Sequence, residues 1–193
     1  ERLAGAIAAA KAAGQRTELS VFYSGHGDVE NGEYFMLLED GRLTRHELYA
    51  LLRRLDAGTT HVMVDSCRSS LIVNARSAGE RGRRPYVGPS PLDPQLADLS
   101  NVGFVLSTST ARASHEWERY RGGVFSHELR SGLRGAADAN LDSKLSYGEL
   151  AAFFERANAS VPNDFRPKVL VRPPHNDLQR SALRWSGPAS LVL

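Results

Sequence analysis

Short apolar runs alternate with segments of helical periodicity along most of this sequence. The runs are rich in branched and aromatic residues and are bounded by small or turn-forming residues, which is typical of buried strands. A further run at residues 34–38 lies between Gly32 and Gly41 and predicts one arm of a hairpin. We expect core strands at residues 18–24, 60–66, 102–108 and 168–171.

Helical signals occupy the intervals between the predicted strands. An alanine-rich start ends at Gly14, a residue type that commonly terminates helices. Capping-box sequences at residues 44–47 and 146–149 each precede apolar residues at helical spacing, and Gly135 closes another amphipathic segment. We expect helices at residues 1–14, 45–55, 125–133 and 147–157.

Strands that alternate with helices favour a mostly parallel central sheet with helices on both faces. We therefore predict an α/β fold, a three-layer α/β/α sandwich. A length of 193 residues with 41% hydrophobic composition suits a single domain, residues 1–193, with a substantial core. Residues 75–98 lack periodicity and are rich in Arg, Gly and Pro, so we expect a long exposed loop there.

The remaining composition excludes several classes of protein. A net charge of +2 gives no case for nucleic-acid binding, and no apolar stretch approaches the ~20 residues of a membrane-spanning helix. No secretory signal peptide is visible. Cys67 is the only cysteine, which rules out an internal disulfide and suits a reducing setting. We therefore expect a cytoplasmic protein that binds neither nucleic acid nor membranes.

Two residues with catalytic chemistry follow predicted strands. His26 follows the strand at 18–24, and Cys67 follows the strand at 60–66. If these strands are parallel neighbours, both side chains lie at the carboxyl edge of the sheet, where open α/β sheets build their sites. A cysteine beside a histidine can act as nucleophile and general base. An inert core cysteine and a structural histidine are the alternative interpretation of these two residues alone.

The residues around this pair resemble a known family. Residues 23–27 (YSGHG) and 65–69 (DSCRS) together are similar to the caspase-like cysteine peptidases, above all the metacaspase and bacterial caspase-like branch. The resemblance covers residues 17–172. Ser70 departs from the pattern, since many members carry glycine there, but the change removes no catalytic group. Further similar segments lie at residues 114–116, 122–126, 132–138 and 166–167.

The resemblance implies a cysteine endopeptidase in which His26 deprotonates Cys67. The backbone N–H groups of Gly27 and Cys67 would form the oxyanion hole. The resemblance also implies that Asp65 lies in the pocket for the residue before the cut and pairs there with Arg or Lys. Ser24 would help to line that pocket. A structural role at the end of the strand is the alternative for Asp65.

Two further residues carry weaker predictions for substrate binding. Asp28 is a second possible acidic wall of the pocket. By analogy with the family, Trp117 covers the next subsite, and a packing or surface tryptophan is the alternative.

The resemblance also predicts that the protein is processed by proteolysis. The family begins with a strand, a helix and a second strand before the helix that residues 1–14 resemble. We expect this missing part of a six-stranded sheet on a separate fragment produced by proteolysis, and a location outside this sequence is the alternative. The loop at 75–98 corresponds to the linker that caspases cut during activation, and a solvated loop without processing is the alternative. For processing, Arg83 is the first choice, followed by Arg81 and Arg76.

Residues 138–149 carry Asp, Asn, Asp, Ser and Glu at positions 1, 3, 5, 9 and 12 of a calcium-binding loop. Ser143 stands where such loops have the glycine of a sharp turn. A polar turn that ends in the capping box at 146–149 explains the same residues. We expect no cofactor and no metal in the active site, with calcium at this loop as an open alternative.

Together these features predict a caspase-like cysteine endopeptidase that is activated from a precursor by proteolysis. Its partners would be protein or peptide substrates, its own N-terminal fragment and an upstream activating protease. A catalytically silent caspase-like module that recruits other proteins is the alternative, although silent relatives usually lose the His or the Cys. A calcium-responsive binding protein rests only on the loop at 138–149. By family analogy, the biological role would be regulated cell death or defence against phage.

Overall fold

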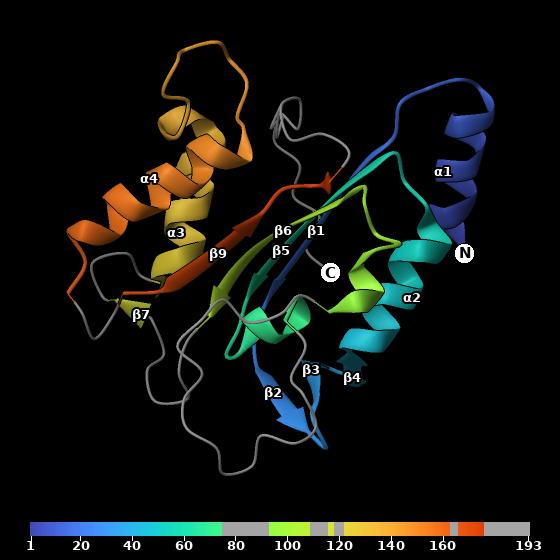
Figure 1. The fold of residues 1–193 in the computed structure, drawn as a ribbon, viewed down its shortest axis with the longest axis horizontal. Coiled ribbons are helices and arrows are strands. Elements are labelled where there is room, and N and C mark those ends of the chain that lie inside the picture. Colours follow the sequence, from blue (N-terminus) through green and yellow to red (C-terminus); the bar gives the residue numbers. More distant parts are fainter. Residues whose placement is uncertain (75–92, 109–115, 118–121, 163–165, 176–193) are drawn as a thin grey trace.

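The computed structural model describes residues 1–74, 93–108, 116–117, 122–162 and 166–175. Its centre is a four-stranded sheet in the order β1-β5-β6-β9 (Figure 1). The first three strands are parallel, and β9 is antiparallel to β6. All four predicted core strands are confirmed, with their ends displaced by one residue at most. They are β1 (Glu18–Ser24), β5 (Thr59–Asp65), β6 (Val102–Thr108) and β9 (Lys168–Arg172).

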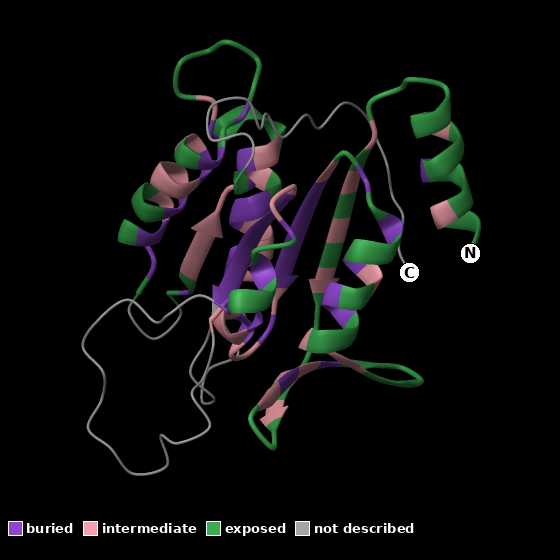
Figure 2. Ribbon diagram, turned by 45° about the vertical axis from the view of Figure 1, so that its right-hand side comes forward, coloured by how far each residue is buried: buried purple, intermediate pink, exposed green. Residues whose placement is uncertain are grey.

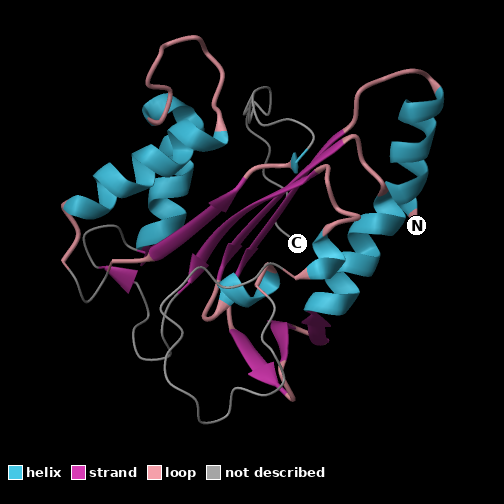
Figure 3. Cartoon of the chain, in the orientation of Figure 1, coloured by secondary structure: helices cyan, strands magenta, loops and turns pink. Residues whose placement is uncertain are grey.

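Helices cover both faces of this sheet, which gives the predicted three layers (Figure 3). Both predicted capping boxes form, since the side chains of Thr44 and Ser146 each accept the backbone N–H of the glutamate three residues later. These caps fix where two of the helices begin. One face carries α1 (Arg2–Ala12) and α2 (Arg45–Leu55), and the other carries α3 (Val124–Ser131) and α4 (Tyr147–Ala159).

The central strand β5 contributes to a separate core on each side of the sheet. Val62 and Val64 pack in the core beneath α2, whereas Met63 packs in the core beneath α3 and α4. In that second core the rings of Phe125 and Phe154 stack with their centroids 5.4 Å apart. Figure 2 shows the buried central strands between the half-buried helices. The residues that follow β5 therefore start from a rigid support.

A smaller antiparallel sheet lies beyond the carboxyl ends of β1 and β5 (Figure 1). It contains β2 (Gly27–Glu30), β3 (Glu33–Leu38) and β4 (Gly41–Thr44). β3 is the hairpin arm predicted at residues 34–38. The apolar pattern did not predict β2 and β4, which are only four residues long.

The segment predicted as a helix over residues 125–133 ends earlier. The α-helix stops at Ser131, and the chain continues as a wider helical turn at Gly132–Ala136. Gly135 has φ 106 there, a conformation that side chains other than glycine rarely adopt.

The predicted exposed loop at 75–98 is wrong in its last part. Asp93 and Leu96 are buried, and a short 3₁₀ helix covers Pro94–Leu96. The guanidinium of Arg45 lies 3.0 Å from the carboxylate of Asp93, so an ion pair draws this part of the chain onto the protein. Residues 75–92 lie outside the described part of the chain.

Arg45 also connects the two described ends of that segment. Its guanidinium lies 3.5 Å from the backbone oxygen of Asn74 and 3.0 Å from the carboxylate of Glu33. In addition, the backbone N–H of Asp93 donates to the carbonyl oxygen of Val73 at 2.9 Å. Residues 73–74 and residue 93 are thus bound to each other and to the start of α2.

β1 lies at an edge of the central sheet and is covered on one face only. Exposed and half-buried residues alternate along it (Figure 2). The side chain of Phe22 is 54% exposed. Among the described strands, β1 pairs with β5 alone. Parallel sheets are usually covered on both faces, so this edge is unusual.

Glu128, on α3, is a carboxyl group in a buried position. The residue is 3% exposed, and neither carboxylate oxygen finds a hydrogen-bond partner among the described residues. Burial raises its pKa from 4.5 to about 7. Between pH 4.5 and about pH 7, the Glu128 carboxyl group is deprotonated in the unfolded chain and protonated in the folded chain. The free energy of unfolding therefore falls as the pH rises through this window, by on the order of 1–3 kcal/mol.

We expect Glu128→Gln to lose this part of the pH dependence, because an amide stays neutral. Thermal melting of both proteins between about pH 5 and about pH 8.5 measures the effect. The melting temperature of the variant should rise relative to that of the wild type as the pH rises. Two curves that stay parallel over this range would contradict the assignment.

Candidate active site

The predicted nucleophile and general base lie at the same edge of the central sheet. β1 and β5 are parallel neighbours, with Ser24 opposite Asp65 at their last residues. His26 is the second residue after β1, and Cys67 is the second residue after β5. In the structure Cys67 is half-buried and His26 is exposed. The strand order thus brings the two segments together.

Backbone and tyrosine contacts fix the turn that carries His26. The N–H of Gly25 donates to the carbonyl oxygen of Asp65 at 3.1 Å, which joins this turn to the end of β5. The carbonyl oxygen of His26 accepts the Tyr23 hydroxyl at 2.7 Å and the N–H of Leu37 at 2.9 Å. The main chain is anchored on two sides, while the imidazole stays open to solvent.

The turn that carries Cys67 is bound to its neighbours as well. Arg68 has φ 58, so the chain reverses sharply directly after the cysteine. The next residue, Ser69, is fully buried and donates its hydroxyl to the carbonyl oxygen of Ser107 on β6 at 2.6 Å. Arg68 donates to the carboxylate of Asp28 at 2.8 Å. Asp28, the second acidic candidate, is therefore already paired with a cation.

The two turns meet at Gly27. A Cβ atom at this position would lie 2.8 Å from the carbonyl oxygen of Cys67 and 2.6 Å from the hydroxyl oxygen of Tyr34. Both separations are too short for a real side chain, so the position requires glycine. The close approach sets the backbone of residue 27 beside the backbone of Cys67, which a shared oxyanion hole needs.

Asp65 contacts the first turn of α3. Its Oδ2 atom accepts the hydroxyl of Ser126 at 2.6 Å, and a Cβ atom at Gly123 would lie 3.1 Å from the same oxygen. Ser24 lies opposite Asp65 on the same face, because register partners in parallel strands point to the same side. Ser126 was not among the predicted site residues, and its only signal in the sequence was the family-like segment at 122–126.

The remaining predicted site residues lie partly outside the described chain. β7 (Glu116–Trp117) pairs with β8 (Gly122–Gly123), which sets the backbone of Trp117 opposite Gly122. This hairpin adjoins Asp65 through Gly123. The predicted processing residues are not among the described ones: Arg76, Arg81 and Arg83.

Hydrogen bonds between backbone N–H groups and polar side chains of the same loop hold residues 138–149 in a tight turn. The backbone N–H of Ser143 donates to the carboxylate of Asp138 at 3.0 Å, and Ser143 has φ 61, although glycine usually fills such a position. The carboxylate of Glu149 accepts the N–H and the hydroxyl of Ser146, and these bonds lower the pKa of Glu149. Across the described parts of the chain, no group of three or more His, Cys, Asp or Glu side chains is arranged to hold a metal ion.

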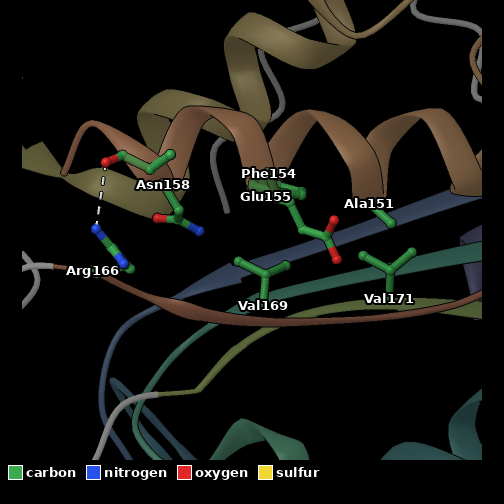
Figure 4. Close-up of a pocket in the computed structure, with 8 residues that line it drawn as sticks. Ala151, Phe154, Glu155, Asn158, Arg166, Val169 and Val171 are labelled. Atoms are coloured by element: carbon green, nitrogen blue, oxygen red, sulfur yellow. Dashed lines mark hydrogen bonds between the residues drawn. The ribbon is translucent and has the colours of Figure 1, made fainter. Parts of the chain in front are cut away.

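A cavity of about 520 Å³ lies between α4 and β9 (Figure 4). Val169 and Val171 of β9 line it on one side and Phe154 of α4 on the other. At one end Arg166 donates to the backbone oxygen of Ala159 at 3.5 Å. None of the predicted site residues lines this cavity, so it is separate from the edge that carries Cys67.

A mostly parallel sheet between helices, with a histidine and a cysteine after adjacent strands, defines an α/β protein with both of these residues at one edge of the sheet. The chain belongs to the caspase domain family, which it matches over residues 4–176. Members of this family are cysteine peptidases and act on proteins or peptides. No curated protein matches the chain. None of the described helices is long and apolar enough to cross a membrane.

Proposed function

We propose that the protein is a cysteine endopeptidase in which Cys67 is the nucleophile and His26 the general base. The contact between the two turns at Gly27 is the observation that carries this proposal. A cysteine with an ordinary pKa of ~8.5 is mostly a thiol at neutral pH, so it needs a base nearby. Transfer of its proton to His26 generates the attacking thiolate.

The backbone at this edge serves the rest of the reaction. The thiolate attacks the peptide carbonyl, and the N–H groups of Gly27 and Cys67 donate to the oxyanion that forms. His26 then gives its proton to the leaving amine, which leaves a thioester on Cys67. Water attacks the thioester, His26 accepts a proton from this water, and the thiol is restored.

Asp65 gives the enzyme a preference for Arg or Lys before the cut. Its half-buried carboxylate is oriented by Ser126, and a fixed carboxylate can hold a guanidinium through two hydrogen bonds. Ser24 shares its face of the sheet. The bound Arg68 leaves Asp28 less suited to this role.

Cleavage of a peptide library derived from a proteome tests the activity and the preference together. The wild-type protein should cut after Arg and Lys, and the Cys67→Ala protein should cut nothing. Cleavage mainly after Asp or after apolar residues would overturn the basic preference but leave the peptidase in place. Equal cleavage by both proteins would overturn the mechanism.

A further strand pairs with the outer edge of β1 in the working enzyme. The exposed Phe22 and the uncovered face of β1 support this part of the proposal. The family resemblance suggests an N-terminal strand-helix-strand segment as the occupant. It would bury Phe22 and extend the four-stranded sheet toward six strands.

A preference for Arg before the cut would also allow the enzyme to cut its own sequence after arginine. Arg83, Arg81 and Arg76 follow Cys67 closely in the sequence, so a short tether favours cutting by a second molecule or by an upstream protease. Arg84 precedes Pro85, which disfavours a cut there. We expect intact-mass analysis of purified wild-type protein to show fragments that end at one of these three arginines.

The Cys67→Ala protein, prepared in the same way, is the control for this processing. Its chain should remain whole if the wild type cuts itself. Cleavage of both proteins would assign the cut to another protease. A wild-type chain that stays whole through residues 75–92 while it is fully active would show that activation needs no cut.

A further inference from the structure

Tyr34 and Ser66 form a buried pair of hydroxyl groups behind the predicted nucleophile. Tyr34, on β3, is 1% exposed, and Ser66, directly before Cys67, is 6% exposed. Their oxygen atoms are 2.5 Å apart. This hydrogen bond connects the small antiparallel sheet with the end of the central sheet, across 32 residues of sequence.

The pair lies where the two catalytic turns meet. A Cβ atom on Gly27 would be 2.6 Å from the Tyr34 hydroxyl oxygen and 2.9 Å from the Ser66 hydroxyl oxygen. The carbonyl oxygen of Cys67 lies 2.8 Å from the same point. Both hydroxyl groups therefore lie against the backbone of Gly27, beside the carbonyl group of Cys67.

The hydroxyl of Tyr34 keeps its proton over the whole working range of a peptidase. Burial is the main cause that raises the pKa of Tyr34 to about 12, while the hydrogen bond with Ser66 opposes the rise and the charges of Tyr23 and Cys67 add to it. The hydrogen bond with Ser66 is thus available both before and after Cys67 ionises.

We propose that Tyr34 is a positioning residue that acts through Ser66. The hydroxyl pair holds the turn of Cys67 against Gly27, so that the thiol faces His26 and the two backbone N–H groups converge on one oxyanion. This inference rests on the proposed function, because it assigns the alignment of that same site.

Tyr34→Phe and Ser66→Ala each remove one side of the bond, and the double variant removes both. Each single variant should lower kcat by about 10- to 100-fold and change KM by less than about twofold, since alignment matters most in the transition state. The double variant should lose no more than about one single variant does, because both changes break the same bond.

Tyr147→Phe is the matched control. Tyr147 is also a buried tyrosine, at the start of α4, but its hydroxyl lies 2.6 Å from Nδ1 of His61 on β5, away from the carboxyl edge. It should cost thermal stability as Tyr34→Phe does and leave kcat near the wild-type value. A loss of kcat in Tyr34→Phe that is matched in Tyr147→Phe would overturn the positioning role.

Alkylation of Cys67 by iodoacetamide at neutral pH gives a readout that needs no substrate. Cys67 is the only cysteine, so the rate reports on one thiol. Tyr34→Phe and Ser66→Ala should react several-fold more slowly than the wild type and Tyr147→Phe, because less thiolate forms when His26 is misaligned. Unchanged rates and unchanged kcat would refute the inference. A wild-type protein without Cys67-dependent turnover would instead refute the proposed function. The alkylation rates would then still test whether Tyr34 and Ser66 position Cys67.

Discussion

Replacement of Cys67 by alanine should abolish peptide hydrolysis and leave the protein folded. The thiolate is the only group proposed to attack the substrate, so the rate should fall by on the order of 10⁴-fold or more. The side chain is half-buried at the end of β5 and belongs to neither core cluster on the two sides of that strand. Its removal should cost about 1 kcal/mol of stability or less. Turnover of a fluorogenic peptide series, measured beside thermal melting, separates the two effects.

His26→Ala is the companion of this experiment. His26 is exposed, so the variant should melt like the wild type and lose activity to a similar extent. A folded Cys67→Ala protein with nearly normal turnover would refute the assignment of the nucleophile. Full activity of His26→Ala, together with an inactive Cys67→Ala protein, would support Cys67 as the nucleophile and refute His26 as the general base.

The variant Asp65→Asn should change the preference for the residue before the cut more than the overall rate of cleavage. The amide keeps the size of the side chain, and its oxygen can still accept the Ser126 hydroxyl. The lost negative charge removes a charge-assisted pair worth roughly 1.5–3 kcal/mol, or about 10- to 100-fold in kcat/KM for substrates with Arg before the cut. Substrates with an apolar residue there should lose far less.

Asp28→Asn is the matched control for this variant. Asp28 lies near the same edge, but its carboxylate is paired with Arg68 on the surface. Its replacement should leave the ratio of kcat/KM for Arg and apolar substrates unchanged. If Asp28→Asn shifts this ratio and Asp65→Asn does not, the wrong acid has been assigned to the pocket.

Periodicity predicted the elements whose burial is regular. The core strands at 18–24 and 102–108 have the bounds that the apolar runs predicted, and both capping boxes form. The edge shared by His26 and Cys67 could be predicted because parallel neighbouring strands end on the same side. These features are encoded within a few residues of sequence.

Contacts between distant segments could not be predicted in the same way. Ser126 lies 61 residues after Asp65, and Tyr34 lies 32 residues before Ser66. Neither pairing leaves a local pattern, because it depends on how α3 and β3 pack against the end of β5. The reversed direction of β9 is likewise set by packing and not by its own apolar run.

The error at residues 93–98 has the same origin. A proline-rich, polar stretch is typical of exposed loops. Here Asp93 is buried because Arg45 offers it a cation from the start of α2, and Leu96 then enters the core under that helix. The partner that decides the burial of Asp93 is 48 residues away in the sequence (93 − 45 = 48).

The contacts of Arg45 also determine what a cut in residues 75–92 would do to the molecule. Asn74 and Asp93 are both bound to Arg45, and Asp93 is bound to Val73, so the two new chain ends would stay on one particle. The fragments would part only under denaturing conditions, and a nicked preparation would migrate as a single species in gel filtration. A cut in the covalent chain would then be irreversible, but the two fragments would remain associated as one enzyme.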